Sequence, residues 1–446
     1  MKQIISFGSY LTKILIIALL FVYLPMVFGS MATNTTSSYI VSSICFFLIT
    51  LIGVKLILGK NKYVGFYAFA FVIQLLIGLA HYLYFVDANY FSSNGEGSAG
   101  FWQEYLSCFD SIKRLQDARS SYGVFYRMSE VEFQNSHPEL YHILSFPFYF
   151  LSHRWLNYEP FNIFSSLMLS CNIMLWYKRR YVENQTVHNA LMFWTAFFPT
   201  FLLADTLWRD AFGVYLISIG LLLVSLSSSI IERILSFILL GYVSFMQRTV
   251  YVIIAGASAF WGNIAKTRDT VLKILYAVLG VIAVFFTGNI ADNTNGEDYN
   301  SGYVNLMSYL ALPIKIIFGM IGPFPWTNFF KGVEVNPAFA WQLQDYIMGT
   351  FQLGYLFAII FKREKFSFKS LDIMTLMGFG IMLSGFISKQ MHIGYISEGL
   401  LFTLPWFFSQ IGIEYKKYLK YSFAILVLLN VILLVIGNIG ISSFWK

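Results

Sequence analysis

Apolar stretches recur along this chain at a length that a membrane requires. Many windows of about 18 to 22 residues hold few or no charges, and a helix of that length crosses the ~30 Å hydrocarbon core of a bilayer. Hydrophobic residues make up 57% of the 446 residues and charged residues 12%, whereas soluble domains carry roughly 25% charged residues. We therefore expect an all-α fold, a polytopic transmembrane helix bundle of about 11–14 spans, with no soluble domain of useful size.

The apolar stretches also predict where the spans lie. Expected spans are 8–28, 38–58, 63–86, 160–177, 187–204, 209–229, 271–288, 341–361, 371–388, 393–413 and 421–441. One helix over 234–261 would be about 42 Å long, well over the bilayer thickness. Two short helices that meet near Gln247 and Arg248 fit better, and a long tilted helix is the alternative.

Positive charges orient the chain, because cytoplasmic loops of membrane proteins are enriched in Lys and Arg. Of the 30 basic residues, 17 can face the cytoplasm together: Lys55, Lys60, Lys62, Lys178, Arg179, Arg180, Arg233, Lys266, Arg268, Lys273, Lys362, Arg363, Lys365, Lys369, Lys416, Lys417 and Lys420. This arrangement requires 140–156 and 304–321 to be short re-entrant or interfacial pieces. The chain then forms one integral-membrane domain, 1–446, with the polar segment 86–137 as a loop on the outer side.

A few cations fall on the outer side and do not follow this bias. They are Arg209 at the start of one span, Arg248 at the expected helix break, and Lys389, which lies with His392 between two late spans. Something other than orientation accounts for their position. A negatively charged ligand on the outer face would explain it.

Arg248 is the first candidate, together with Gln247, in the run SFMQRTVYVIIAG at 244–256. A charged side chain near the middle of an apolar run costs at least about 2.5 to 3.5 kcal/mol on insertion scales and points to a functional site. The alternative is that Arg248 marks a short loop and reaches the lipid headgroups. Arginine suits phosphate better than lysine, since its planar fork gives two parallel hydrogen bonds.

A second group of charges lies in ADTLWRDAFGVYLI, 204–217, with Asp205, Arg209 and Asp210 at the outer end of a span. A helix N-terminus that carries an arginine is a ready anion site. The alternative is a charge cluster at a helix start, where the helix dipole favours Asp210.

The candidates for a general base are weaker. His392 in SKQMHIGYISEG, 388–399, lies three residues after Lys389, and histidine titrates near neutral pH. A lone interfacial histidine is more often a structural hydrogen-bonder. His137 and Asp87 are rivals for the role, because both lie where the long loop joins the membrane.

The turn PFPW at 323–326 cannot be regular helix, because its prolines lack an amide hydrogen. Trp326 there either stacks on a sugar face or anchors the loop at the headgroups.

Glycine-rich nucleotide loops, helical zinc pairs and serine-nucleophile elbows are missing from the sequence. We expect neither a metal nor a cofactor. The net charge of +7 lies mostly in short loops, so it does not predict nucleic-acid binding.

Three of these segments together resemble a known family. They are FFPTFLLADTLWRDAFGVYLI at 197–217, FMQRTVYVII at 245–254 and GPFPW at 322–326, in a chain with one long outer loop. The chain resembles the bacterial polysaccharide polymerases of the Wzy class, which belong with the O-antigen ligases in the GT-C superfamily of integral-membrane glycosyltransferases. The resemblance covers about 190–400, and its motifs are short and degenerate.

The resemblance implies a polymerase of the bacterial inner membrane, with its active site facing the periplasm, in O-antigen or capsule biosynthesis. A glycan on undecaprenyl pyrophosphate is transferred to a lipid-linked oligosaccharide repeat unit, without a metal. By position, Arg209 and Arg248 match family arginines that bind pyrophosphate, and His392 lies where the ligases carry a catalytic histidine. The loop 86–137 lies earlier in the chain than the large loop of many members, and a chain-length regulator is an expected partner.

On this interpretation the substrate-binding residues are Arg209, Arg248, Lys389, Asp210, Gln247 and Trp326, and the candidate bases are His392, Asp87 and His137. Two alternatives stay open. One is a GT-C transferase that uses a polyprenyl-monophosphate sugar, with Asp87 as its base. The other is a flippase or transporter of lipid-linked oligosaccharides, which would need cations along a central path and no base.

Overall fold

The computed structural model describes residues 5–87, 147, 150–151, 158–181, 184–203, 210–264, 312–321, 339–366, 371–387 and 393–438. Every regular element within these residues is a helix, so the expected all-α class is confirmed for them. Contacts divide the chain into two compact units, which we call unit 1 (Met1–Tyr181 with Met192–Ser301) and unit 2 (Val182–Leu191 with Gly302–Lys446). The single domain expected over 1–446 stays a prediction.

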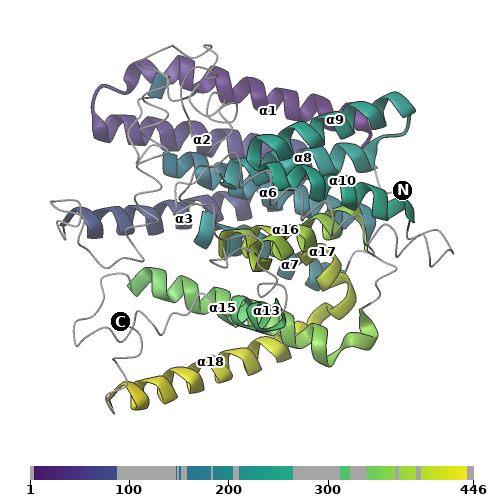
Figure 1. Cartoon of the computed structure of the whole chain (residues 1–446). Helices are drawn as coiled ribbons and strands as arrows, with labels where there is room; N and C mark the ends of the chain where they lie inside the picture. The colour runs from purple at the N-terminus through teal and green to yellow at the C-terminus, as the bar shows by residue number, and fades with distance from the viewer. Residues whose placement is uncertain are drawn as a thin grey trace, which may run out of the picture. The chain divides into compact units, whose positions relative to one another are not determined.

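The helices of unit 1 follow the expected spans within a few residues (Figure 1). They are α1 (Phe7–Phe28), η1 (Gly29–Met31), α2 (Thr35–Leu58), α3 (Asn61–Asp87), α6 (Tyr158–Arg180), the second half of α7 (Gln185–Leu203), α8 (Asp210–Leu226), α9 (Ile230–Gln247) and α10 (Thr249–Ile264). The expected span 271–288 lies outside the described residues, as do the loop 88–137 and most of 140–156.

The helices of unit 2 also match the expected spans. They are the first half of α7, α13 (Leu312–Ile321), α15 (Phe339–Phe361), η4 (Arg363–Lys365), α16 (Ile373–Ile387), α17 (Ile393–Ile411), η6 (Gly412–Glu414) and α18 (Tyr415–Asn438). The ten residues of α13 measure about 15 Å, too short to cross a bilayer. This agrees with the short piece expected within 304–321.

Three of the described helices are long and apolar enough to cross a membrane: Phe7–Met31, Thr36–Leu58 and Ile230–Gln247. Their outward side chains are apolar, for example Leu19 on α1 and Ile238 on α9, which are both more than half exposed. Such a surface is costly in water and favourable in lipid. The coarse prediction of a membrane protein with transmembrane helices is thus supported, whereas 11–14 spans stay a prediction.

Helix α6 is the centre of unit 1. Every side chain from Glu159 to Tyr177 is buried, because α2, α3 and α8 all pack against this helix. One side of α6 joins an aromatic cluster in which the ring of Phe161 lies 5.5 Å from Phe46 and 5.2 Å from Phe212, between centroids. Polar side chains are tolerated here because neighbouring helices shield them from lipid.

Hydrogen bonds between side chains tie α6 to its neighbours. The Tyr10 hydroxyl of α1 donates to Asn172 Oδ1 over 3.0 Å, and Asn172 Nδ2 donates to Ser218 Oγ of α8 over 2.8 Å. On another side, Ser170 Oγ lies 2.8 Å from the Tyr67 hydroxyl of α3 and 2.8 Å from Thr195 Oγ1 of α7. Interhelical hydrogen bonds of this kind hold helices together where burial of apolar surface gives little driving force.

Basic residues gather at one end of unit 1, which we call the basic end: Lys55, Lys60, Lys62, Lys178, Arg179, Arg180 and Arg233. Lys55 hydrogen-bonds to Asn61 between α2 and α3, and the Lys178 ammonium lies 4.1 Å from the centroid of the Tyr63 ring. Arg179 Nη2 donates to the Ser225 carbonyl at the end of α8 over 2.7 Å. Segments far apart in sequence thus bring their expected cytoplasmic charges to one place.

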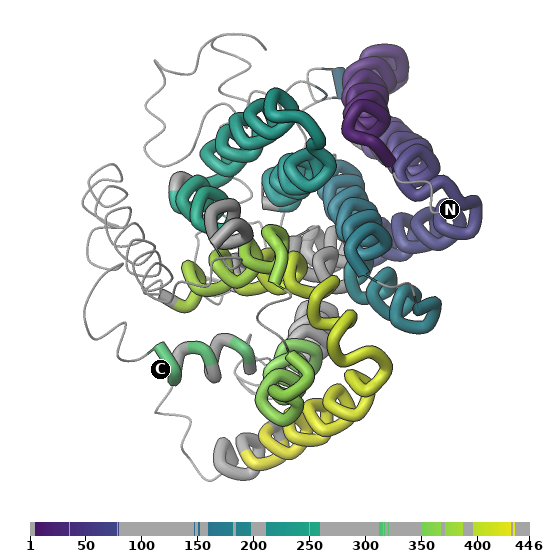
Figure 2. Tube along the Cα trace, turned by 90° about the vertical axis from the view of Figure 1, so that its right-hand side faces the viewer, coloured from purple at the N-terminus to yellow at the C-terminus, as the bar shows by residue number. Residues whose placement is uncertain are grey.

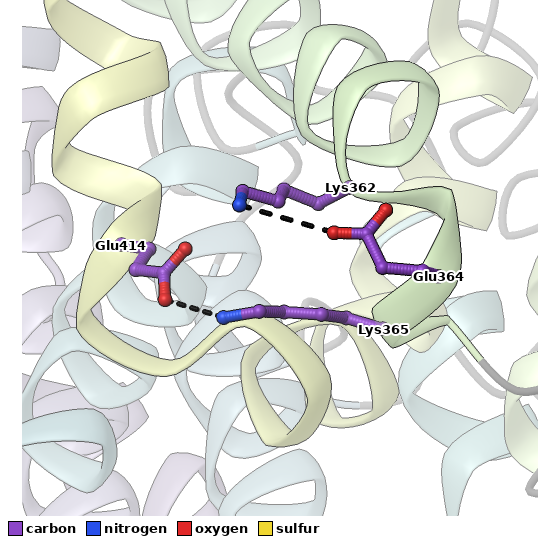
Figure 3. Close-up of polar contacts among 4 residues, drawn as sticks. All are labelled: Lys362, Glu364, Lys365 and Glu414. Carbon is purple, nitrogen blue, oxygen red and sulfur yellow. Dashed lines mark hydrogen bonds and ion pairs between the residues drawn. The ribbon is translucent and has the colours of Figure 1, made fainter.

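In the described part of unit 2, a close helix crossing and ionic contacts at the turns hold the helices together. Gly378 of α16 and Gly399 of α17 lie backbone against backbone, so an added Cβ on either would overlap the other helix. At the turns, Lys365 of η4 pairs with Glu414 of η6, and Lys362 Nζ lies 3.8 Å from Glu364 Oε1 (Figure 3). The hydrogen bond from Lys365 lowers the pKa of Glu414.

Candidate functional site

The α9 helix carries the candidate site at its far end. It starts with a capping box, in which the Glu232 amide donates to Ser229 Oγ over 3.2 Å and the Ser229 amide donates to Glu232 Oε2 over 3.2 Å. Its 18 residues span about 27 Å, close to the ~30 Å of the hydrocarbon core. If α9 starts at one boundary of the hydrocarbon core, its end therefore reaches the opposite boundary.

Arg248 separates α9 from α10. Its backbone is extended, with φ −161° and ψ 138°, and its amide donates to the Ser244 carbonyl over 2.9 Å to close α9. The Tyr251 amide then donates to the Arg248 carbonyl over 2.9 Å at the start of α10. The two helices pack against each other, and Figures 1 and 2 show them side by side. The expected pair of short helices is confirmed.

This geometry corrects one part of the sequence argument. Arg248 is not inside a continuous apolar helix, and its partly exposed side chain lies at a turn about one bilayer thickness from the start of α9. The insertion cost expected for a charge at mid-membrane therefore does not apply in full. The position of the guanidinium, rather than the cost of burying it, makes Arg248 a candidate.

Gln247 joins the α9–α10 turn to the start of α8. Its side chain is fully buried and lies directly over Gly213, so a Cβ at Gly213 would overlap its amide oxygen. Gly213 is three residues after Asp210, which is the first residue of α8. The turn at Gln247 and Arg248 thus lies within about one helical turn of Asp210 along α8.

Two helix N-termini flank Arg248. Helix α10 begins at Thr249, directly after Arg248, and α8 begins at Asp210, beside the Gln247 contact. The first turn of each helix has backbone N–H groups without intrahelical partners and carries the positive end of the helix dipole. Together with the guanidinium, they make this end of unit 1 favourable for an anion.

We call this end of unit 1 the Arg248 end. It lies opposite the basic end. Helix α8 runs from the Arg248 end to the basic end, and α9 runs back antiparallel to it. Gly220 of α8 lies against Leu240 of α9 near the middle of the pair. Helix α6 starts at the same end, since Phe161 contacts Phe212 there, and α3 ends there at Asp87 after leaving the basic end at Tyr63. The structure thereby brings together the chain at Asp210, Gln247 and Arg248, whereas α3 contacts α2 and α6 and no described contact joins Asp87 to the α9–α10 turn.

The other expected site residues lie outside the described residues: His137, Arg209, Trp326, Lys389 and His392. Arg209 directly precedes Asp210 in the chain, whereas Lys389 and His392 belong to unit 2. The expected convergence of Arg209, Arg248 and Lys389 stays a prediction. No group of three or more metal-ligating side chains occurs among the described residues.

Three buried carboxylates among the described residues escaped the sequence analysis as site residues. Glu159 of α6 is 4% exposed, Asp372 before α16 is 6% exposed, and Glu398 of α17 is fully buried. Asp372 Oδ1 accepts hydrogen bonds from the Thr375 amide and hydroxyl, so it caps α16. Glu159 was passed over because the expected span began one residue later, at 160. The signal that could have found it is a polar series in an apolar helix, in which Asn162 and Ser166 follow Glu159 at helical spacing.

No protein-family model, curated protein or solved structure matches this chain.

Proposed function

We propose that this protein is an integral-membrane glycosyltransferase that polymerises lipid-linked oligosaccharide repeat units at the periplasmic face of the bacterial inner membrane. The observation that carries the proposal is the α9–α10 turn, where Arg248 stands beside two helix N-termini at the end of unit 1 opposite the basic end. The resemblance to Wzy-type polymerases supplies the reaction. The resulting polymer would be an O-antigen or a capsular polysaccharide.

In this reaction, a hydroxyl of the acceptor repeat unit attacks C1 of the glycan on undecaprenyl pyrophosphate. A C–O bond forms to the acceptor, the bond from C1 to the pyrophosphate oxygen breaks, and the electron pair leaves with the pyrophosphate. Arg248 stabilises the negative charge that develops on that leaving group, with Arg209 and Lys389 as further cations. A base, for which His392, Asp87 and His137 are candidates, takes the hydroxyl proton.

The proposed orientation puts the basic end of unit 1 in the cytoplasm. Positively charged loops stay on that side during insertion, and seven basic residues lie at that end, where Glu232 in the first turn of α9 is an acid among the described residues. The Arg248 end then faces the periplasm. Arg248 is tolerated there because a lipid phosphate neutralises it, which accounts for a cation that the positive-inside bias does not explain.

The test is polymerisation by purified protein in lipid nanodiscs, with the lipid-linked repeat unit isolated from cells that lack this protein. We expect a ladder of products with wild-type protein and at least a 100-fold lower rate with Arg248→Ala, about the effect of removing one transition-state donor. Arg248→Lys should recover little, because a point charge replaces a bidentate fork. Arg233→Ala, at the other end of the same helix, is the matched control and should polymerise normally.

Long products from a folded Arg248→Ala protein would contradict the pyrophosphate assignment. If the protein forms a glycosidic bond only with a polyprenyl-monophosphate sugar, the other GT-C mechanism is correct. Movement of the intact lipid-linked unit across the bilayer, with no new bond, would identify a flippase.

A further inference from the structure

Basic side chains gather at the turns that end α15 and begin α18. Among the described residues, six cations lie there with two acids, Glu364 and Glu414. The cations are Lys362, Arg363 and Lys365 in the turn after α15, and Lys416, Lys417 and Lys420 in the first two turns of α18. We call these six basic residues the unit 2 basic patch.

Tertiary contacts join the two halves of the patch, although Lys365 and Glu414 are 49 positions apart in the sequence. These two residues form an ion pair, and Figure 3 shows the Lys362 side chain extending in the same direction as that of Lys365. Helix α15 packs against α18, where a Cβ at Gly354 would lie 3.1 Å from Leu419 Cδ2. The patch is therefore one surface that the fold of unit 2 creates.

The pKa of Glu414 reflects cations from both halves of the patch. The hydrogen bond from Lys365 lowers this pKa most, against an opposing effect of desolvation. The positive charges of Lys365, Lys362 and Lys417 lower the pKa further. One carboxylate thus lies within the field of the turn after α15 and of the first turn of α18.

The acids leave most of the positive charge of the patch uncompensated. Glu414 pairs with Lys365, and Glu364 Oε1 lies 3.8 Å from Lys362 Nζ. Four cations of the patch are exposed: Arg363, Lys416, Lys417 and Lys420. An excess of exposed positive charge on one surface favours an anionic ligand.

Exposed apolar side chains adjoin the patch on both helices. Phe361, at the end of α15, is 66% exposed, and Phe423 of α18 is 56% exposed. Lys417 Nζ lies 5.8 Å from the ring centroid of Tyr421, which is half exposed. Tyrosine and lysine side chains at the edge of an apolar surface are typical of the lipid headgroup level, because their apolar parts face the acyl chains and their polar ends face water.

The cations and the apolar border together select the class of ligand. A soluble phosphate would contact the cations but would leave the apolar side chains uncovered. A phospholipid with a net negative charge offers a phosphate to the ammonium groups and an acyl chain to the apolar surface. A zwitterionic lipid carries its own cation, which the patch repels.

We propose that the unit 2 basic patch binds anionic phospholipids, an inference that goes beyond the proposed function and does not depend on it. The lipid phosphate contacts Lys416, Lys417 and Lys420, and an acyl chain lies along the exposed apolar side of α18. Clusters of lysine and arginine beside a membrane helix recognise anionic headgroups in this way. In the orientation proposed above, the bound lipid belongs to the cytoplasmic leaflet.

The experiment measures lipid contact directly at α18. Purified full-length protein is placed in phosphatidylcholine nanodiscs that contain a small fraction of phosphatidylglycerol with a photoreactive acyl chain, and labelled residues are mapped by mass spectrometry. Phosphatidylcholine with the same photoreactive chain is the reference probe. We expect at least about fivefold more label within 415–432 from phosphatidylglycerol, the effect of one or more cations near the headgroup. The excess should shrink as salt rises, because salt screens exposed charges.

Substitutions of the three lysines of α18 test the role of their charges. The triple variant Lys416→Gln/Lys417→Gln/Lys420→Gln should lose the excess label, whereas Lys416→Arg/Lys417→Arg/Lys420→Arg should keep it. The matched control is Lys55→Gln/Lys60→Gln/Lys62→Gln, which removes the same charge from unit 1 and should not change the labelling of α18. Label from phosphatidylcholine should be equal in all these proteins, which shows that α18 still faces lipid.

Three results would overturn this inference. One is equal labelling by the two probes in wild-type protein, and another is a full excess in the triple glutamine variant. The third is loss of the excess when inorganic phosphate is added at constant ionic strength, which would identify a site for a soluble anion. If the triple glutamine variant does not insert, wild-type protein decides the question, because an excess that is independent of salt would show that the cations do not hold the lipid. The polymerisation test is separate, so either proposal can fail alone.

Discussion

At the scale of single residues, the contact between Gln247 and Gly213 determines where Arg248 stands. With any residue other than glycine at 213, the Gln247 side chain would have to leave its present position, because a Cβ would occupy the space of the glutamine amide. The absence of one side chain on α8 thus lets a buried side chain of α9 fix the turn. Arg248, the next residue, is then held beside the N-terminus of α8.

Gly213→Ala should destabilise the protein by about 1–3 kcal/mol, the usual cost of overpacking, and should lower polymerisation as well. The reason is that Gln247 must leave its buried position and shift the turn. Reversible unfolding in mixed micelles measures the free energy. The double variant Gly213→Ala/Gln247→Ala should be no less stable than Gln247→Ala alone, because the Gln247 side chain that would overlap the new Cβ is gone.

Gly241→Ala is the control for this change, since nothing lies within 4 Å of a Cβ at Gly241 of α9. It should be neutral or slightly stabilising, as expected for alanine in a helix. A Gly213→Ala protein as stable and active as wild type would show that Gln247 does not position the turn.

At the scale of helices, unit 1 places apolar side chains outward and polar side chains inward. In α9, Ile234 and Ile238 face out, whereas Ser244 and Gln247 are buried. In α6, Asn172 is buried and bonded to two other helices. Lipid explains this arrangement, because a bilayer solvates apolar groups and leaves hydrogen bonding to the interior of the protein.

Tyr10→Phe tests whether these interior hydrogen bonds stabilise the bundle. It removes the hydroxyl that donates to Asn172 and leaves the ring in place. The expected loss is about 0.6 kcal/mol and no more than about 1.7 kcal/mol, the range for interhelical hydrogen bonds in membranes. Unfolding in mixed micelles gives the value, with Tyr23→Phe as the control because Tyr23 of the same helix is exposed.

At the scale of the whole molecule, the two ends of unit 1 differ in the source of their positive charge. The basic end gathers charges from α2, α3, α6 and α9, whereas at the Arg248 end the described residues bring the starts of α8 and α10 beside Arg248. The first arrangement is what insertion requires, and the second is what an anionic substrate requires. The proposed function depends on these ends facing opposite sides of the membrane.

Cysteine labelling in intact cells tests this orientation. In a variant without Cys45, Cys108 and Cys171, we expect Thr33→Cys to react with a membrane-impermeant maleimide from outside, because exposed Thr33 lies at the Arg248 end between α1 and α2. Asn61→Cys, exposed at the basic end, should react only after the cells are permeabilised. The reverse pattern would put Arg248 in the cytoplasm and exclude a periplasmic polymerase.

Much of the helical framework could be predicted from the sequence, because apolar length and charged boundaries are local properties. The limits of α1, α2 and α15 follow from them within a few residues, and the break at Arg248 follows from a run too long for one bilayer crossing. The partners of each helix could not be predicted in this way. Burial of Glu159 depends on packing around α6, and the seat of Gln247 depends on one glycine 34 residues earlier in the chain. Hydrophobicity selects which segments enter the membrane, whereas close packing between distant segments selects which polar groups meet inside it.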